Sequence, residues 1–141
     1  MNDIKLEVEK SIEVRFSEVD LMGVVWHGSY PLYLEDAREA FGARYGLSYF
    51  KYIEERITAP VVELNIKYRH PVLYGMKPIV KITYRPTEAA KIIFDYEIRN
   101  PEDGTICLTA TSVQVFMDMN HNLLWDSPQF YMDWKRQMGL I

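Results

Sequence analysis

The spacing of hydrophobic residues changes near the N-terminus in a way that limits the possible folds. Residues 5–16 alternate polar and apolar side chains, which predicts a strand with one buried face. Between residues 29 and 45 the apolar side chains recur three and four positions apart, which predicts a helix of about 25 Å. Alternation then returns and persists to residue 117. One long helix that interrupts a run of strands favours an α+β domain, with the helix packed on one face of a sheet.

The rest of the chain is expected to form strands and two short helices. Strands are predicted at residues 62–68, 80–85, 91–99 and 105–117, and short helices at 48–55 and 127–139. Ser29 and Ser127 are the expected N-caps of the long helix and the last helix. Short turns, such as the one at residues 100–104, make an antiparallel sheet the natural arrangement. We expect one domain spanning residues 1–141, with the first and last strands at the edges of the sheet.

Composition excludes several classes of protein. The chain has 141 residues and a formal net charge of −4, which argues against nucleic-acid binding because that requires a clustered basic surface. No apolar window approaches the ~18 residues of a membrane helix, and residues 1–11 contain no apolar signal segment. The lone Cys107 cannot form an internal disulfide and is expected to be a packing residue in a reducing compartment. These features predict a cytoplasmic protein without an integral membrane segment.

The segment between the first strand and the long helix carries the residues most suited to catalysis. Asp20, Gly23 and His27 lie just ahead of the predicted helix. A helix N-terminus offers unpaired N–H groups and a partial positive charge, which suit a developing oxyanion. Asp20 is therefore a candidate nucleophile or general base. From these residues alone, a structural turn in which Asp20 only ends the strand remains an open interpretation.

The same segment resembles the signature of a known family. The stretch VRFSEVDLMGVVWHGSYPLYLEDAR is similar to that of the 4-hydroxybenzoyl-CoA thioesterase family of hotdog-fold proteins, and within it to the tol-pal-associated acyl-CoA thioesterases. The matching positions are Asp20, Gly23, Val24, Val25, Trp26, His27 and Tyr30. The later stretch VVELNIKYRHPVLYGM, with Pro71, is also similar. The departures are Val19, Trp26 and Pro31, which bear on the choice of substrate more than on the type of reaction.

This resemblance implies a fold and a reaction. The fold would be a long central helix wrapped by a curved antiparallel sheet of five to six strands. The reaction would be hydrolysis of an acyl-CoA thioester to free CoA and a carboxylic acid. Asp20 would attack the carbonyl carbon or activate a water, and the backbone N–H of His27 would hold the carbonyl oxygen. Gly23 would allow a tight turn, while Val25, Trp26 and Tyr30 would contact the substrate. Trp26, Tyr30 and Tyr33 are expected to line the entry of the acyl chain.

The resemblance also implies a homo-oligomer, a dimer or a tetramer, with each active site at an interface between chains. Glu63 and Asn65 are then candidates for substrate contacts from the neighbouring chain. The candidates for binding CoA phosphates are first Lys67 and Arg69 and then Lys81 and Arg85. Arg38 on the long helix is either solvated or paired with a carboxylate near the site.

Three other functions stay open at this point. A hydratase or dehydratase on the same fold would use a histidine beside the acid and release no CoA. A thioesterase acting on acyl-carrier protein would use the same residues on a different donor. A non-catalytic acyl-CoA binding module would bind without turnover. No metal or cofactor is expected, because the three histidines lack metal spacing, residues 118–122 lack the glycine and glutamate of a calcium loop, and no nucleotide or serine-hydrolase motif occurs.

Overall fold

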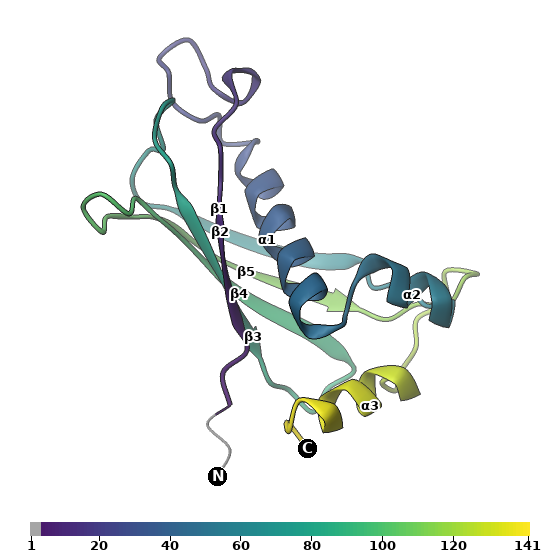
Figure 1. Cartoon of the computed structure of the whole chain (residues 1–141). Coiled ribbons are helices and arrows are strands. Elements are labelled where there is room, and N and C mark those ends of the chain that lie inside the picture. The colour runs from purple at the N-terminus through teal and green to yellow at the C-terminus, as the bar shows by residue number, and fades with distance from the viewer. Residues whose placement is uncertain (1–3) are drawn as a thin grey trace.

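The computed structural model describes residues 4–141 and has a long helix packed against an antiparallel sheet, with two shorter helices at one end (Figure 1). In chain order the elements are β1 Glu7–Ser11, the 3-10 turn η1 Phe16–Glu18, α1 Tyr30–Tyr45, α2 Tyr49–Glu55, β2 Val61–Tyr68, β3 Ile79–Arg85, β4 Lys91–Arg99, β5 Ile106–Val115 and α3 Gln129–Gln137. The expected order of strand, long helix, strands and terminal helix is confirmed.

The sheet has five antiparallel strands in the order β1-β3-β4-β5-β2. The longest pairing joins β4 to β5, and β2 pairs only with β5, for example Asn65 opposite Thr111. The expectation that the last strand forms an edge is therefore wrong. The chain crosses over after α2, which leaves β1 and β2 as the edges of the sheet and places β5 in its interior.

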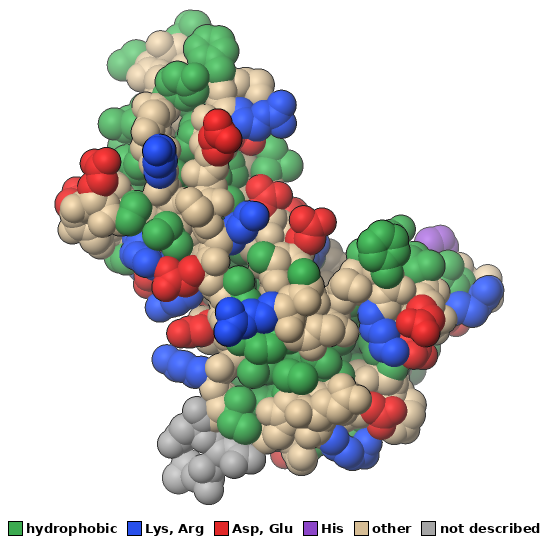
Figure 2. Space-filling model, in the orientation of Figure 1, with side chains coloured by type: hydrophobic (Ala, Val, Ile, Leu, Met, Phe, Trp, Pro, Cys, Tyr) green, Lys and Arg blue, Asp and Glu red, His purple; other side chains and the backbone are tan. Residues whose placement is uncertain are grey.

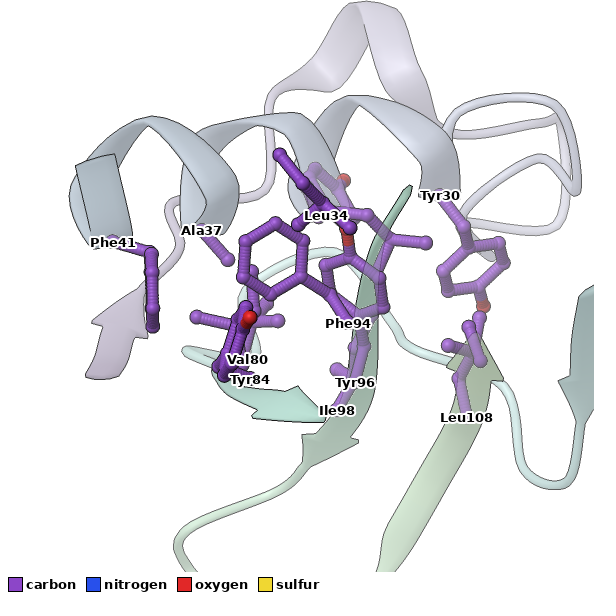
Figure 3. Packing of buried hydrophobic residues seen from close by; sticks show 14 of the residues in the cluster. Tyr30, Leu34, Ala37, Phe41, Val80, Tyr84, Phe94, Tyr96, Ile98 and Leu108 are labelled. Atoms are coloured by element: carbon purple, nitrogen blue, oxygen red, sulfur yellow. The ribbon is translucent and has the colours of Figure 1, made fainter. Parts of the chain in front are cut away.

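The core lies between α1 and the inner face of the sheet. Aromatic and aliphatic side chains of the helix, such as Phe41 and Leu34, pack on rings from β3 and β4 (Figure 3). Phe41 contacts Phe94 at 4.8 Å between ring centroids. Gly46 ends the helix in the left-handed conformation that glycine adopts without steric cost, as the sequence predicts. Cys107 is buried within β5, in keeping with its expected packing role.

Three local predictions differ from the structure. The first strand ends at Ser11, and Ile12 and Val14 stay buried without belonging to it, while Phe16 is exposed. Ser29 does not cap α1, because its Oγ donates instead to the carbonyl oxygen of Glu18 at 3.1 Å. The last helix begins at Gln129 after Pro128 and has no side-chain cap, so Ser127 is not its N-cap.

The inner face of β5 is more polar than its sequence suggests. In the sequence both faces of this strand carry hydrophobic residues, with Leu108 and Ala110 on one and Val113 and Val115 on the other. The inner face buries Leu108, Ala110, Ser112 and Gln114, whereas Val113 and Val115 point to the outer face. No helix among residues 4–141 is long and apolar enough to cross a membrane.

Candidate active site

The segment ahead of α1 folds into a tight hairpin, here called the site hairpin (residues 18–26). The Trp26 N–H donates to the Glu18 carbonyl at 2.9 Å, and the Asp20 N–H donates to the Val24 carbonyl at 2.8 Å. Gly23 turns the chain at φ 74°, a conformation that other residues rarely adopt, so its predicted role in a tight turn is confirmed. The hairpin is held to the rest of the fold because the Tyr74 N–H donates to the Gly23 carbonyl at 2.8 Å.

Asp20 presents an oriented carboxylate at the start of this turn. Its Oδ1 accepts hydrogen bonds from the N–H groups of Met22 at 2.8 Å and Val24 at 3.2 Å. Its Oδ2 accepts no hydrogen bond from any residue in the described part of the chain. The residue is exposed, so one oxygen is fixed by the backbone and the other faces the surroundings. This is the geometry that a nucleophile or a general base needs.

His27 follows the hairpin, in a turn that leads into α1. The Ser29 N–H closes this turn by donating to the Trp26 carbonyl at 2.8 Å. The backbone N–H groups of His27 and Gly28 donate to no other group within residues 4–141, and both residues are exposed. Two free N–H groups, three and two residues ahead of the first residue of a helix, suit a carbonyl oxygen that becomes negative. The His27 ring packs beside Trp26, with 4.9 Å between the ring centroids.

Glu18 organises the site hairpin, and sequence reasoning missed it. Its Oε1 accepts hydrogen bonds from the Tyr33 hydroxyl at 3.0 Å and from the Arg15 N–H at 2.8 Å. Burial and the adjacent Glu18 carboxylate raise the pKa of Tyr33, which therefore stays a neutral donor. Tyr33 is buried in the core, so its expected place at the acyl entry is wrong. No local sequence signal links the two residues, because the helix brings them together.

Tyr30 and Val25 are buried beneath the hairpin. The Tyr30 hydroxyl accepts a hydrogen bond from the Val72 N–H at 3.1 Å, and its ring lies next to Leu108 (Figure 3). Val25 is 3% exposed and its own N–H donates to the Val72 carbonyl at 2.8 Å. In this chain both side chains support the site hairpin from below, and their contact with substrate stays a prediction.

We expect Tyr30→Phe to lower the free energy of unfolding by about 1–3 kcal/mol, because the buried Val72 N–H loses its acceptor. Urea denaturation measures this loss, and Tyr74→Phe, at an exposed tyrosine, is a control that should change little. An unchanged stability together with a large rise in the KM for a thioester would instead make Tyr30 a substrate contact.

Trp26 is the exposed aromatic residue of the site. Its indole lies directly over Gly28, where an added Cβ would come within 2.2 Å of the ring. Glycine at position 28 therefore makes room for the indole beside the free N–H groups, a role that the sequence analysis did not identify. Trp26 is 53% exposed, so part of its surface is open to a ligand or a neighbouring chain.

The candidates on β2 lie apart from the site hairpin. Asn65, Lys67 and Arg69 line a shallow hollow of about 560 Å³ on the outer face of the sheet, opposite α1, and Glu63 shares that face by alternation. Lys67 and Arg69 form no ion pair within residues 4–141, and Arg69 donates from Nε to the Thr109 hydroxyl at 3.4 Å. Their roles in binding substrate and CoA phosphates stay predictions.

Other charged candidates are already paired. Lys81 lies 4.0 Å from Glu97, and Arg85 pairs with Asp95. Two of the four cations proposed for CoA phosphates are thus neutralised in this chain. Arg38 pairs with Glu35 on its own helix at 2.5 Å, and not with a carboxylate of the site hairpin.

Comparison with known proteins places these features in a family. Residues 14–134 match the model of the thioesterase-like superfamily. YneP of Bacillus subtilis, provisionally named an acyl-CoA thioesterase, is 34% identical over 110 residues, which cover 78% of this chain and 79% of YneP. The DHNA-CoA thioesterase of Staphylococcus aureus is 26% identical and superposes with a TM-score of 0.81 over 95% of this chain and 89% of that chain.

A solved 4-hydroxybenzoyl-CoA thioesterase is 16% identical and superposes with a TM-score of 0.79 over 92% of this chain and 98% of that chain, which is a likeness of fold. The predicted hotdog architecture, with a sheet wrapped on one central helix, is confirmed by this agreement and by the observed topology. The chain belongs to the thioesterase-like superfamily.

Proposed function

We propose that this protein hydrolyses acyl-CoA thioesters to free CoA and a carboxylic acid, with Asp20 and the free N–H groups of His27 and Gly28 as the catalytic groups. One observation carries the proposal: a single hairpin holds an oriented carboxylate with a free oxygen and leads into a turn with two unpaired N–H groups. Membership of the thioesterase-like superfamily and the likeness to YneP agree with it.

The reaction balances without a metal or cofactor. The free carboxylate oxygen of Asp20 attacks the carbonyl carbon, or it takes a proton from a water that attacks. The carbonyl oxygen becomes negative and accepts hydrogen bonds from the N–H groups of His27 and Gly28. The carbon–sulfur bond then breaks and CoA leaves as a thiolate. In the nucleophilic route a water hydrolyses the mixed anhydride on Asp20, and both routes end with the free acid.

A second copy of the chain would complete the site. The inner-face side chains Val62, Leu64 and Tyr68 of the edge strand β2 stay 51%, 43% and 53% exposed. An edge strand with an uncovered apolar face is suited to pairing with another strand. Antiparallel pairing of β2 with its copy would cover this face and bring the site hairpin of one chain toward α2 of the other.

Both the site hairpin and α2 carry exposed apolar side chains that this pairing would cover. Leu21 and Met22 are exposed at the tip of the site hairpin, and Tyr49 and Phe50 are exposed on α2. Figure 2 shows hydrophobic side chains gathered at the top of the molecule, over the segment between β1 and α1. Dimer formation by this pairing, with tetramers built from it, is part of the proposal.

Thiol release over a panel of acyl-CoA thioesters tests the activity, beside the same acyl groups on acyl-carrier protein. We expect free thiol and free acid in equal amounts, with CoA thioesters as the better donors. Conversion of the acyl group by addition or loss of water, with no free thiol, would indicate a hydratase. Binding without any turnover would indicate a binding module.

A further inference from the structure

A hollow between α1 and α2 is lined by both apolar and polar side chains. It has a volume of about 890 Å³, and Figure 2 shows the surface hollowed between the parts of the molecule that carry the two helices. Phe41, Ile53, Ile57 and Phe94 supply apolar lining, and Tyr52 and Gln114 also line it. These residues come from α1, α2, the loop that follows α2, β4 and β5, so the hollow exists only in the folded chain.

Gln114 carries an acceptor that the chain leaves without a donor. The side chain is 6% exposed, and its Nε2 donates to the Ala59 carbonyl at 2.7 Å. This bond orients the amide, because exchange of the oxygen and nitrogen would lose it. The Oε1 atom is buried and has no hydrogen-bond partner among the described residues. A buried polar atom left unpaired is costly and rare in native proteins, so it requires an explanation.

Tyr52 offers a matching hydroxyl on the same hollow. Its ring packs edge-to-face on Phe130 at 5.6 Å, and its hydroxyl forms no hydrogen bond within residues 4–141. Burial raises the pKa of Tyr52, which keeps the hydroxyl protonated and able to donate. The hollow therefore combines one oriented acceptor with one neutral donor.

These two groups select the chemistry of a ligand. A hydroxyl can donate to the Gln114 Oε1 atom or accept from the Tyr52 hydroxyl, and a methyl group can do neither. An anionic end is disfavoured, because three carboxylates, Glu35, Asp36 and Glu39, line the hollow against two cations, Arg38 and Lys10. An uncharged hydroxyl at the end of an apolar chain fits the lining best.

The hollow and the site hairpin lie at opposite ends of β2. The Tyr68 hydroxyl donates to the His27 carbonyl at 3.0 Å at the end of the strand, whereas Ala59 precedes its beginning at Val61. Eight residues at about 3.3 Å each separate the two places by about 26 Å. Antiparallel pairing of two β2 strands brings these opposite ends together, so the hollow of one chain lies beside the site hairpin of the other.

We propose that this hollow binds the far end of the acyl group in trans and that Gln114 and Tyr52 recognise a hydroxyl there, which makes hydroxyacyl-CoA thioesters the substrate class. The inference rests on the proposed thioesterase function and on the β2 pairing. It adds the chemical character of the acyl group and the chain that recognises it.

Matched pairs of substrates test the recognition. Hexanoyl-, octanoyl-, decanoyl- and dodecanoyl-CoA are compared with their ω-hydroxy counterparts. At one chain length we expect the hydroxyl to raise kcat/KM by about tenfold or more, because its absence leaves buried groups unpaired. Equal use of both members at every length would overturn the proposal. Calorimetry measures the Kd of each substrate pair for the Asp20→Asn variant, in which no turnover is expected. A preference for the hydroxylated member in binding would support the inference even if the proposed catalytic role failed.

Two variants assign the preference to residues. Tyr52→Phe removes a hydroxyl that forms no hydrogen bond within residues 4–141, so we expect a normal melting temperature and equal kcat/KM for the two members of each substrate pair, which is the loss of the hydroxyl preference. Gln114→Met is expected to lose it too. The matched control is Tyr96→Phe, since that hydroxyl already pairs with Ser112 at 2.8 Å, and it should change both substrates equally. A preference that survives in Tyr52→Phe would overturn the assignment.

Mixed dimers test the trans arrangement. Tyr52→Phe chains are combined with an excess of Asp20→Asn chains, so that each intact Asp20 faces a partner with an intact Tyr52. We expect the hydroxyl preference to return in the mixture. Turnover without a preference for the hydroxylated substrate would mean that the acyl group is recognised by the same chain that supplies Asp20, which contradicts the proposal.

Discussion

Asp20→Asn is expected to lower kcat for acyl-CoA hydrolysis by at least about 10²-fold, the lower range for loss of a positioned base or nucleophile. The amide oxygen of asparagine can still accept the hydrogen bonds that Met22 and Val24 donate to Asp20 Oδ1. The hairpin should therefore keep its shape while the carboxylate charge is lost. Thiol release measures kcat, and thermal unfolding should show a melting temperature close to that of the native chain.

The chain contains a matched control for this substitution. Asp118 begins a turn of the same kind, in which its Oδ1 accepts from the N–H groups of Asn120 at 2.8 Å and Asn122 at 3.0 Å. Those hydrogen bonds lower the pKa of Asp118, with the one from Asn122 the largest cause. Asp118→Asn should leave kcat unchanged because this turn lies outside the site. Full activity of Asp20→Asn would remove Asp20 from the mechanism.

The second large effect is expected from Leu64→Lys on the edge strand β2. Burying a leucine side chain stabilises an interface by about 1.5–3 kcal/mol, and two-fold symmetry counts each loss twice. A total of about 3–6 kcal/mol corresponds to roughly a 10²- to 10⁴-fold rise in the Kd of the dimer. Because Leu64 is 43% exposed in the single chain, the fold itself should lose little stability.

Analytical ultracentrifugation measures the dissociation, and thiol release at concentrations below the new Kd measures its consequence. We expect activity to fall together with the dimer and to recover at high protein concentration. Ile141→Lys, at an apolar residue that is 59% exposed at the C-terminus, is the control and should remain a fully active dimer. A monomeric Leu64→Lys chain with full activity would contradict the shared site.

Much of the fold could be predicted because the buried faces repeat at regular intervals. Alternation identifies the strands, and the three-and-four spacing identifies α1 to within one residue of its observed start at Tyr30. The glycine at position 23 and the order of residues around Asp20 indicate a tight turn before that helix. Each of these features depends on residues that are neighbours along the chain.

The details of the candidate site depend on contacts between distant residues. The hydrogen bond from Val72 to Tyr30 spans 42 positions, and the bond from Tyr33 to Glu18 spans 15. The sequence therefore predicts that the tyrosines of the first helical turn contact substrate, whereas the folded chain buries Tyr30 and Tyr33. Gln114 is a similar case. The alternating pattern of β5 does not reveal that the Gln114 Oε1 atom has no hydrogen-bond donor among the described residues.

The sequence by itself determined the α+β class, the position of the long helix and the hairpin that carries Asp20, because local spacing and turn chemistry specify them. Only the tertiary structure decided that β2 is an edge, that Tyr30 and Tyr33 support the hairpin from the core, and that a hollow with an unpaired Gln114 lies beside α2. The physical reason is that strand order and burial arise from long-range packing, which places side chains from separate elements against one another.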